Sequence, residues 1–166
     1  MASDTQGRFS TPRRYVTRHN ENGIATVSAH PNSEVKPFGD GSQGVPLWSA
    51  IASPADISNC GLEQPADIST SSSGSFFTAY DLPPKYDGPF HRSITLDYVF
   101  VFKGTVVLTM EDGTRVTLGE GDTIVQRGTM HKWSNEGEGW ARMMSVMMPA
   151  MPAIDNGREI ETHWPY

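Results

Sequence analysis

The sequence predicts an all-β domain, built as a sandwich or a barrel. Helical periodicity is scarce, and 16 Gly and 12 Pro divide the 166 residues into short stretches rich in Val, Thr, Ile and aromatic side chains. From Asp97 onward these stretches recur at even spacing with turn residues between them, which is typical of sandwiches and barrels. The length suits one domain with a single core.

The expected strands follow the apolar and β-branched stretches. In chain order they are 14–18, 24–29, 45–52, 75–82, 97–103, 105–110, 114–118, 123–126, 131–135 and 140–148. The pairs Asn22-Gly23 and Asp112-Gly113 predict tight hairpin turns within this series. The loop 53–74 is long for a compact domain, and we expect either a lid over the mouth of a site or plain disorder.

The chain divides into three parts. Residues 13–148 form the barrel, residues 1–12 a flexible N-terminal arm, and residues 149–166 a C-terminal tail. Both ends are expected to pack on the barrel or to cross to a partner.

Charge and composition exclude several partners. Thirteen Lys and Arg against nineteen Asp and Glu give a net charge of -6, and the one basic cluster is Arg13, Arg14 and Arg18. Nucleic acid and anionic membranes are excluded as partners, because they require concentrated positive charge. No stretch approaches the roughly 18 apolar residues of a membrane span, so a cytoplasmic protein is expected. Cys60 is the only cysteine, which rules out an internal disulfide and indicates a buried or loop thiol.

Two histidines about forty positions apart begin β-rich segments. His91 stands in a segment that starts at Gly88, and His131 follows Gly128. Because side chains alternate across a strand, an inward His91 places Asp97 inside as well. By the same alternation Ser93, Thr95, Val99 and Val101 point inward, whereas Phe90, Arg92, Tyr98, Phe100 and Phe102 point outward.

This spacing resembles the two motifs of the cupin superfamily, G-x5-H-x-H-x(3,4)-E-x6-G and G-x5-P-x-G-x2-H-x3-N. Residues 88–104 follow the first motif through His91, Asp97 and Gly104, and residues 121–135 follow the second through Gly128, His131 and Asn135. The departures are Ser93 for a histidine, Asp97 for Glu, Gln126 for Pro, and one residue fewer after Gly121. The chain is similar to small single-domain cupins of the cupin-2 type, some of them encoded among fungal polyketide biosynthesis enzymes. In that subgroup the Ser93 position is ordinarily not histidine.

The resemblance implies a double-stranded β-helix, the jelly-roll barrel of cupins, with its site in the barrel. Two imidazoles and one carboxylate can bind Zn, Fe, Mn or Ni, so His91, Asp97 and His131 are the candidate ligands of one divalent metal. A metal-free acid/base site is the alternative, because a histidine and a carboxylate suffice for proton transfer. The candidate catalytic residues are therefore His131, His91, Asp97 and, as an anchor for a substrate oxyanion, Arg127. Those expected to contact substrate are Ser93, Trp133, Met144 and Phe90.

The expected function is an enzyme of polyketide-type secondary metabolism. A lyase or isomerase would perform dehydration, decarboxylation or proton-transfer isomerisation on an oxygenated carbonyl or aromatic compound through an enolate-like anion. A metal-dependent cupin oxygenase or oxidoreductase is one alternative, and a small-molecule-binding cupin without turnover is another. By analogy with cupins, a homodimer is expected.

Overall fold

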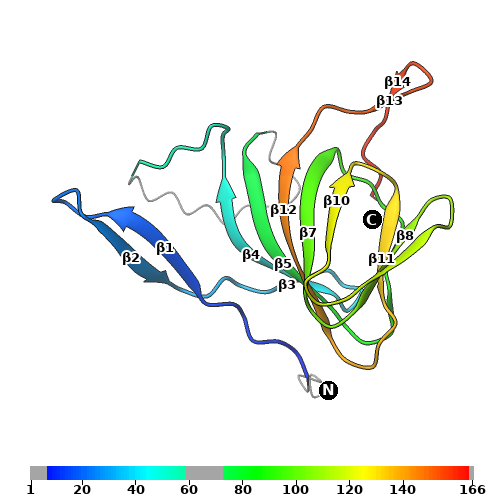
Figure 1. Cartoon of the computed structure of the whole chain (residues 1–166), viewed down its shortest axis with the longest axis horizontal. Coiled ribbons are helices and arrows are strands. Elements are labelled where there is room, and N and C mark those ends of the chain that lie inside the picture. Colours follow the sequence, from blue (N-terminus) through cyan, green and yellow to red (C-terminus); the bar gives the residue numbers. More distant parts are fainter. Residues whose placement is uncertain (1–6, 59–72, 165–166) are drawn as a thin grey trace.

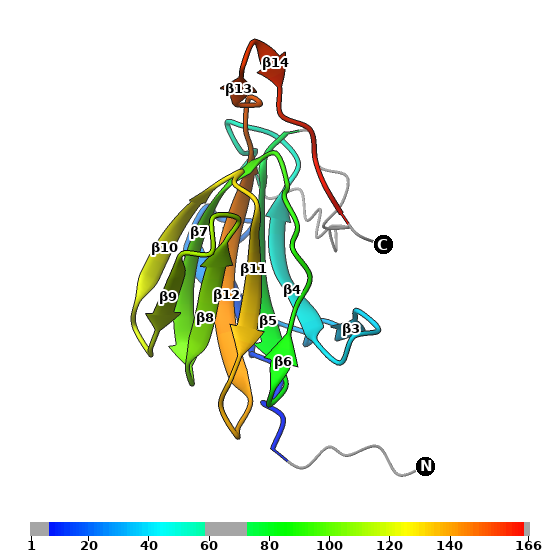
Figure 2. The ribbon, with the colours of Figure 1, turned by 90° about the vertical axis from the view of Figure 1, so that its right-hand side faces the viewer.

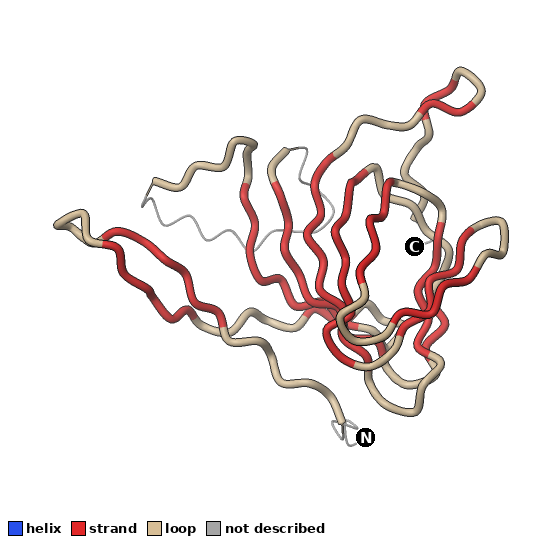
Figure 3. Tube along the Cα trace, viewed as in Figure 1, coloured by secondary structure: helices blue, strands red, loops and turns tan. Residues whose placement is uncertain are grey.

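All regular structure in the described part of the chain is β. The computed structural model describes residues 7–58 and 73–164, and Figures 1 and 3 show strands and loops throughout these ranges. Within them no helix is long and apolar enough to cross a membrane. The lid expected at 53–74 lies largely outside the described residues, as does Cys60.

The strands match the apolar stretches of the sequence closely. Their bounds are β1 Arg14–His19, β2 Ala25–His30, β3 Lys36–Pro37, β4 Gln43–Ala50, β5 Ser75–Leu82, β6 Tyr86–Asp87, β7 Thr95–Lys103, β8 Val106–Met110, β9 Arg115–Leu118, β10 Thr123–Arg127, β11 His131–Asn135, β12 Ala141–Pro149, β13 Ile154–Asp155 and β14 Arg158–Glu159. The strands β3, β6, β13 and β14 were not predicted, because two residues are too few to show an alternating pattern.

Two antiparallel sheets face each other and form a jelly-roll barrel. The six-stranded sheet has the order β10-β7-β12-β5-β4-β3, and the four-stranded sheet has the order β6-β11-β8-β9. Many neighbours, such as β7 with β12 and β12 with β5, are distant in sequence, as in the predicted double-stranded β-helix. Figure 1 shows the four-stranded sheet across from the six-stranded sheet and the β1–β2 hairpin projecting away from both, and in Figure 2 the four-stranded sheet lies in front of the six-stranded sheet.

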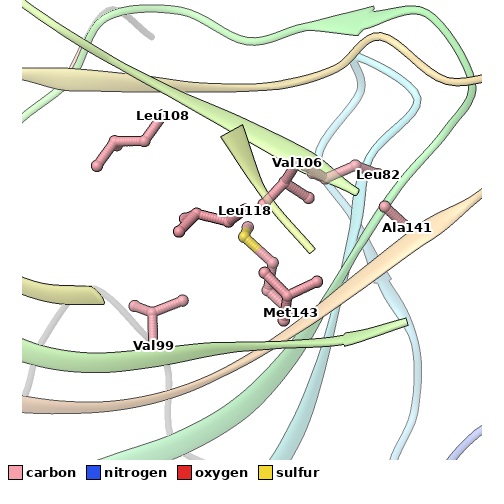
Figure 4. Close-up of a cluster of buried hydrophobic side chains, with 8 residues drawn as sticks. Leu82, Val99, Val106, Leu108, Leu118, Ala141 and Met143 are labelled. Carbon is pink, nitrogen blue, oxygen red and sulfur yellow. The ribbon is translucent and has the colours of Figure 1, made fainter. Parts of the chain in front are cut away.

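Apolar side chains from both sheets fill one end of this space. Figure 4 shows side chains of β5, β7, β8, β9 and β12 pointing toward one another. The cluster consists of Leu82, Val99, Val101, Val106, Leu108, Leu118, Ala141 and Met143. The predicted alternation along β7 is confirmed: Val99 and Val101 are buried, whereas Tyr98 and Phe102 are more than half exposed.

A second buried layer lies on the outer face of the six-stranded sheet. Arg142 and Asp81 are paired there through two short contacts, Nε to Oδ1 at 2.6 Å and Nη2 to Oδ2 at 2.8 Å. Gln43 donates to Asp81, and Arg142 also donates to the carbonyl of Ser10 in the N-terminal segment. That segment therefore packs on the barrel at this point.

The methionine expected to face the pocket lies on the outer face instead. Met144 packs with Val45, Leu47 and Ala79 in a separate apolar cluster. Met143 belongs to the interior cluster, and the Sδ atom of Met147 accepts a hydrogen bond from the interior Tyr80 at 3.6 Å. Alternation along β12 decides this, since neighbouring residues point to opposite faces.

Candidate functional site

The two histidines predicted from the sequence meet between the sheets. His91 and His131 form an antiparallel bridge, in which each backbone N–H donates to the other residue's carbonyl, at 2.8 and 3.1 Å. Their rings are tilted toward each other with centroids 4.4 Å apart. His131 is 4% exposed and His91 is half-buried. The predicted convergence of the two imidazoles is confirmed.

Two glycines of the motifs position these histidines. Gly88 donates its N–H to the carbonyl of Trp133 at 3.0 Å, and a Cβ at Gly88 would lie 2.8 Å from that same oxygen. A side chain there would push the His91 segment away from β11. Gly128 has a φ of +62° in the turn between β10 and β11, a conformation that disfavours residues with a Cβ.

The ring contacts assign the same tautomer to both histidines. The Nδ1 atom of His131 lies 2.8 Å from the carbonyl of Thr129, and that of His91 lies 3.1 Å from the carbonyl of Pro89. A carbonyl only accepts hydrogen bonds, so each Nδ1 carries the proton. The two N–H bonds of the nearby Gln126 amide are directed to the carbonyl and the hydroxyl of Thr129, so that amide does not donate to His131 Nδ1. Each ring therefore keeps the lone pair of Nε2 as a base or ligand.

Burial keeps both imidazoles neutral. Desolvation and the proximity of His91 lower the pKa of His131 to about 4, although the bond to Thr129 opposes the shift. Desolvation also lowers the pKa of His91 below its usual value, opposed by the bond to Pro89. Because a charge on one ring opposes a charge on the other, the two rings act as a coupled base.

Asp97 lies on the inner face of β7, opposite Gln126, which in turn contacts His131. It is 6% exposed, and its Oδ1 atom has no hydrogen-bond partner among the described residues. Burial raises the pKa of Asp97 to about 6, partly offset by the hydroxyl of Thr95. The pKa of the buried Tyr80 phenol is raised as well, by desolvation and then by the charge of Asp97. An underpaired carboxyl with a raised pKa is typical of functional sites.

Gln126 stands between Asp97 and His131. It is the cross-strand partner of Asp97 in the β7–β10 ladder, and its amide nitrogen lies 3.0 Å from His131 Nδ1. The same amide donates to the Thr129 carbonyl at 3.0 Å. In the sequence, Gln126 stands out only as a departure from the second motif. It lies two positions from Ile124, so both side chains point to the inner face of β10, and this spacing is the signal that could have indicated a contact with His131.

The expected metal ligands are not assembled into one group. Among residues 7–58 and 73–164, no three His, Cys, Asp or Glu side chains are placed to hold a metal ion. His91 and His131 alone supply two nitrogens, whereas a catalytic zinc usually has three protein ligands. Gln126 occupies the place between the imidazoles and Asp97, which is why the carboxylate does not join them. The arrangement as it stands does not fit a three-ligand metal.

The other predicted site residues are divided between the interior and the surface. Trp133 lies edge-on to His131 with centroids 5.9 Å apart, and the Ser93 hydroxyl lies 2.7 Å from that of Thr95. Arg127 is exposed on the rim. Phe90 lies against Lys132, whose ammonium is 5.7 Å from the ring centroid, on the outer side of β11. Phe90 and Met144 therefore lie on outer faces rather than against the histidines.

Trp164 lies against the site because the tail folds back on the barrel, an arrangement that the sequence permits but does not decide. Its indole lies edge-on to His91 with centroids 4.6 Å apart. Nothing in the local sequence of the tail predicts this contact, because it depends on where the tail folds.

Comparison with known proteins agrees with the geometry. Residues 79–147 match the family model described as "Cupin domain", a range that includes both histidines and Asp97. The "Phomopsin biosynthesis cluster protein C'" of Diaporthe leptostromiformis is 29% identical over 89% of this chain and 84% of its own length. The "Cupin-domain-containing oxidoreductase srdD" of Neurospora crassa is 28% identical over 89% of this chain and 81% of its own length.

A solved structure confirms the fold. The cupin domain of Schizosaccharomyces pombe Cnp3 superposes with a TM-score of 0.53 at 10% identity, covering 82% of this chain and 87% of that one. The paired motifs, the two facing sheets and these matches agree: the chain contains a cupin domain at residues 79–147, and over most of its length it is similar to a protein of a fungal biosynthesis cluster and to a cupin-domain-containing oxidoreductase.

Proposed function

We propose that this protein is an enzyme of small-molecule biosynthesis that transfers protons on an oxygenated carbonyl or aromatic substrate, as a lyase or an isomerase. The observation that carries the proposal is the contact of two neutral imidazoles, His91 and His131; the buried carboxyl of Asp97 lies on the same inner surface, separated from His131 by Gln126. Such a set can remove a proton and return one without a change of oxidation state.

The imidazole pair is the base in this scheme. The lone pair of an Nε2 atom takes a proton from the carbon next to a substrate carbonyl. The C–H electron pair then forms the enolate, and its negative charge lies on the carbonyl oxygen. The imidazolium formed on the pair lies beside that charge and stabilises it. A charge on one ring opposes a charge on the other, so the pair holds one added proton at a time. The base is regenerated when that proton passes to the product.

Asp97 is the proposed proton donor in the second half of the reaction. With a pKa of about 6, its carboxyl exchanges protons near neutral pH. Where the substrate carries a neighbouring double bond, the enolate is extended, and return of a proton to its γ carbon completes an isomerisation. Expulsion of a β-hydroxyl as water completes a dehydration, with the proton supplied by the imidazolium. Arg127 on the rim is the expected anchor for a substrate oxyanion, a role that its exposure leaves accessible.

An oxidoreductase is the second candidate. It is supported by relatives such as the cupin-domain-containing oxidoreductase srdD of Neurospora crassa. The relatives in biosynthesis clusters support small-molecule chemistry under either candidate. Binding of a small molecule without turnover is the third outcome that an experiment must distinguish.

Deuterium exchange tests the proton-transfer proposal. The protein is incubated in D₂O with a panel of aromatic β-hydroxy ketones and 1,3-diketones, and products are analysed by mass spectrometry. Deuterium at the acidic carbon, loss of water or isomerisation at unchanged elemental composition is expected. His131→Ala should reduce the rate by about 100-fold or more, the usual contribution of a general base. His19→Ala, on the projecting β1 strand, is the matched control and should match the parent.

Each other outcome has a distinct meaning. A change of substrate oxidation state would replace the proposal with the oxidoreductase. Binding of panel members without exchange or conversion would indicate the binding protein. Retention of full exchange in the His131→Ala protein would contradict the role given to the imidazole pair.

The titration of His131 tests the electrostatics without a substrate. In a protein labelled with ¹⁵N at histidine, both site imidazoles should show the Nδ1–H tautomer at pH 7. His131 should stay neutral until the pH falls to about 4, because burial and His91 oppose its protonation. A midpoint near 6.5 would contradict the buried, coupled pair.

A further inference from the structure

We infer that Trp164 of the C-terminal tail is a substrate-contacting wall of the site and that it selects a flat aromatic substrate. The inference rests on the proposed function, because it places the substrate next to His91. It assigns a specificity-determining role to a tail that the motifs do not include.

Hydrogen bonds to Arg92 hold the tail beside the histidines. His163 and Arg92 form an antiparallel bridge in which each N–H donates to the other's carbonyl, both at 2.8 Å. The Arg92 side chain also donates through Nε to the carbonyl of Glu161 at 2.9 Å. The residue next to Arg92 is His91, so this bridge sets the distance between Trp164 and the site. Figure 2 shows the tail descending beside the segment that follows β6.

The indole extends a continuous series of rings. Trp133 contacts His131, His131 contacts His91, and His91 contacts Trp164, with centroid separations of 5.9, 4.4 and 4.6 Å. The two inner rings belong to the proton-transfer pair and the two outer rings are indoles. A substrate that reaches His91 from the tail side must therefore pass along the Trp164 ring.

Trp164 remains free to bind. Its edge-on contact with His91 leaves the indole 54% exposed, whereas Trp133 is only partly accessible within the barrel. An exposed indole next to a reactive group is suited to stack on the face of an aromatic ring, which adds affinity beyond simple burial. The tail supplies its hydrogen bonds to Arg92 from the backbone, so the indole is not needed to hold the tail.

The substrate class follows from this surface. A planar ring can lie on the indole face with its oxygenated carbon at His91, whereas a saturated ring of the same size is puckered and meets the indole through fewer atoms. The structure therefore favours an aromatic or fused-aromatic substrate over an aliphatic one.

Binding of two matched probes tests the inference. 2-Naphthol and its saturated counterpart decahydro-2-naphthol are titrated into the full-length protein by isothermal calorimetry. We expect 2-naphthol to bind more tightly, Trp164→Ala to weaken it by about tenfold, and Trp164→Phe to retain most of the affinity. The saturated probe should be almost insensitive to both substitutions. Trp48→Ala, which removes another partly exposed indole on β4, is the matched control and should change neither probe.

A ring-current measurement checks the contact itself. The ring protons of His91 should shift in the free Trp164→Ala protein and stay near their original position in Trp164→Phe. Arg92→Ala, which loses the bond to Glu161 but keeps the indole, should weaken 2-naphthol in the same direction by a smaller factor.

The outcomes separate this inference from the proposed function. Equal binding of 2-naphthol by the parent and Trp164→Ala, or no preference over the saturated probe, would overturn the role of Trp164 while leaving the His131 exchange test intact. Loss of exchange in His131→Ala with unchanged probe binding would be consistent with both. Absence of any 2-naphthol binding to the parent would overturn the inference as well.

Discussion

Asp81 and Asp97 are two buried carboxylates of the same six-stranded sheet, on opposite faces, and they differ in how they are paired. Asp81 is fully buried, bound through both oxygens by Arg142 and further bonded by Gln43. Asp97 is almost as buried, but its Oδ1 has no partner among the described residues. The first arrangement locks the N-terminal segment to the barrel. The second leaves a carboxyl with a raised pKa inside the barrel, separated from His131 by Gln126.

The comparison teaches that burial alone does not identify a reactive group. A buried charge with every hydrogen-bonding atom paired contributes to structural integrity, and its removal leaves its partner uncompensated. A buried charge without such pairing costs free energy, and a protein keeps one where chemistry uses it. The same substitution, aspartate to asparagine, should therefore have opposite effects on the stability of the two faces.

The largest effect is expected for Asp81→Asn. Arg142, only 4% exposed, would keep its charge without its carboxylate partner. We expect a loss of about 3 kcal/mol in the free energy of unfolding, measured by urea denaturation. The double variant Asp81→Leu with Arg142→Met removes both charges and should recover more than half of the loss. A single Asp81→Asn variant as stable as the parent would show that the pair is not a structural lock.

Asp97→Asn should stabilise the protein at neutral pH. The pKa of Asp97 is raised from 3.8 to about 6, so the folded state opposes ionisation, and this cost is present in full above pH 6. It declines as the pH falls through 6 and is absent below about 4, where both states are protonated. We expect a gain on the order of 2 kcal/mol at pH 7 to 8 that vanishes near pH 4. Urea denaturation at both pH values measures it.

The Asp97 substitution also separates stability from activity. Under the proposed function, the more stable Asp97→Asn protein should lose deuterium-exchange activity, because asparagine cannot exchange a proton near neutral pH. A variant that is stabilised but fully active would keep the electrostatic account and remove Asp97 from the mechanism. A destabilised variant at pH 7 would contradict both.

The smallest effect is expected at an exposed carboxylate. Glu120 pairs with Lys103 at 2.9 Å, and both side chains are about half exposed. Solvent screens such pairs, so Glu120→Gln should change the unfolding midpoint far less than either buried substitution. Increasing salt should leave this difference small. If Glu120→Gln lowers the free energy of unfolding as much as Asp81→Asn does, then the exposure of a carboxylate does not predict how much its substitution changes stability.

Much of the fold was predictable because alternation is a local property. The pattern along 95–103 placed Val99 and Val101 inside and Tyr98 outside, as the structure confirms. The same rule placed His91 and Asp97 on the inner face. It also holds along β12, but with four methionines in that strand it did not say which of them point inward; the neighbouring strands decided that Met143 and Met147 do and that Met144 does not.

The sequence by itself determined the all-β class, the strand series and the meeting of His91 with His131, because periodicity, turn residues and motif spacing are written along the chain. Only the tertiary structure decided that Gln126 lies between Asp97 and His131, that Asp97 keeps an unpaired oxygen, and that Trp164 closes on His91. Those features depend on which distant strands pair and in what register. That information belongs to packing between segments and is absent from any one of them.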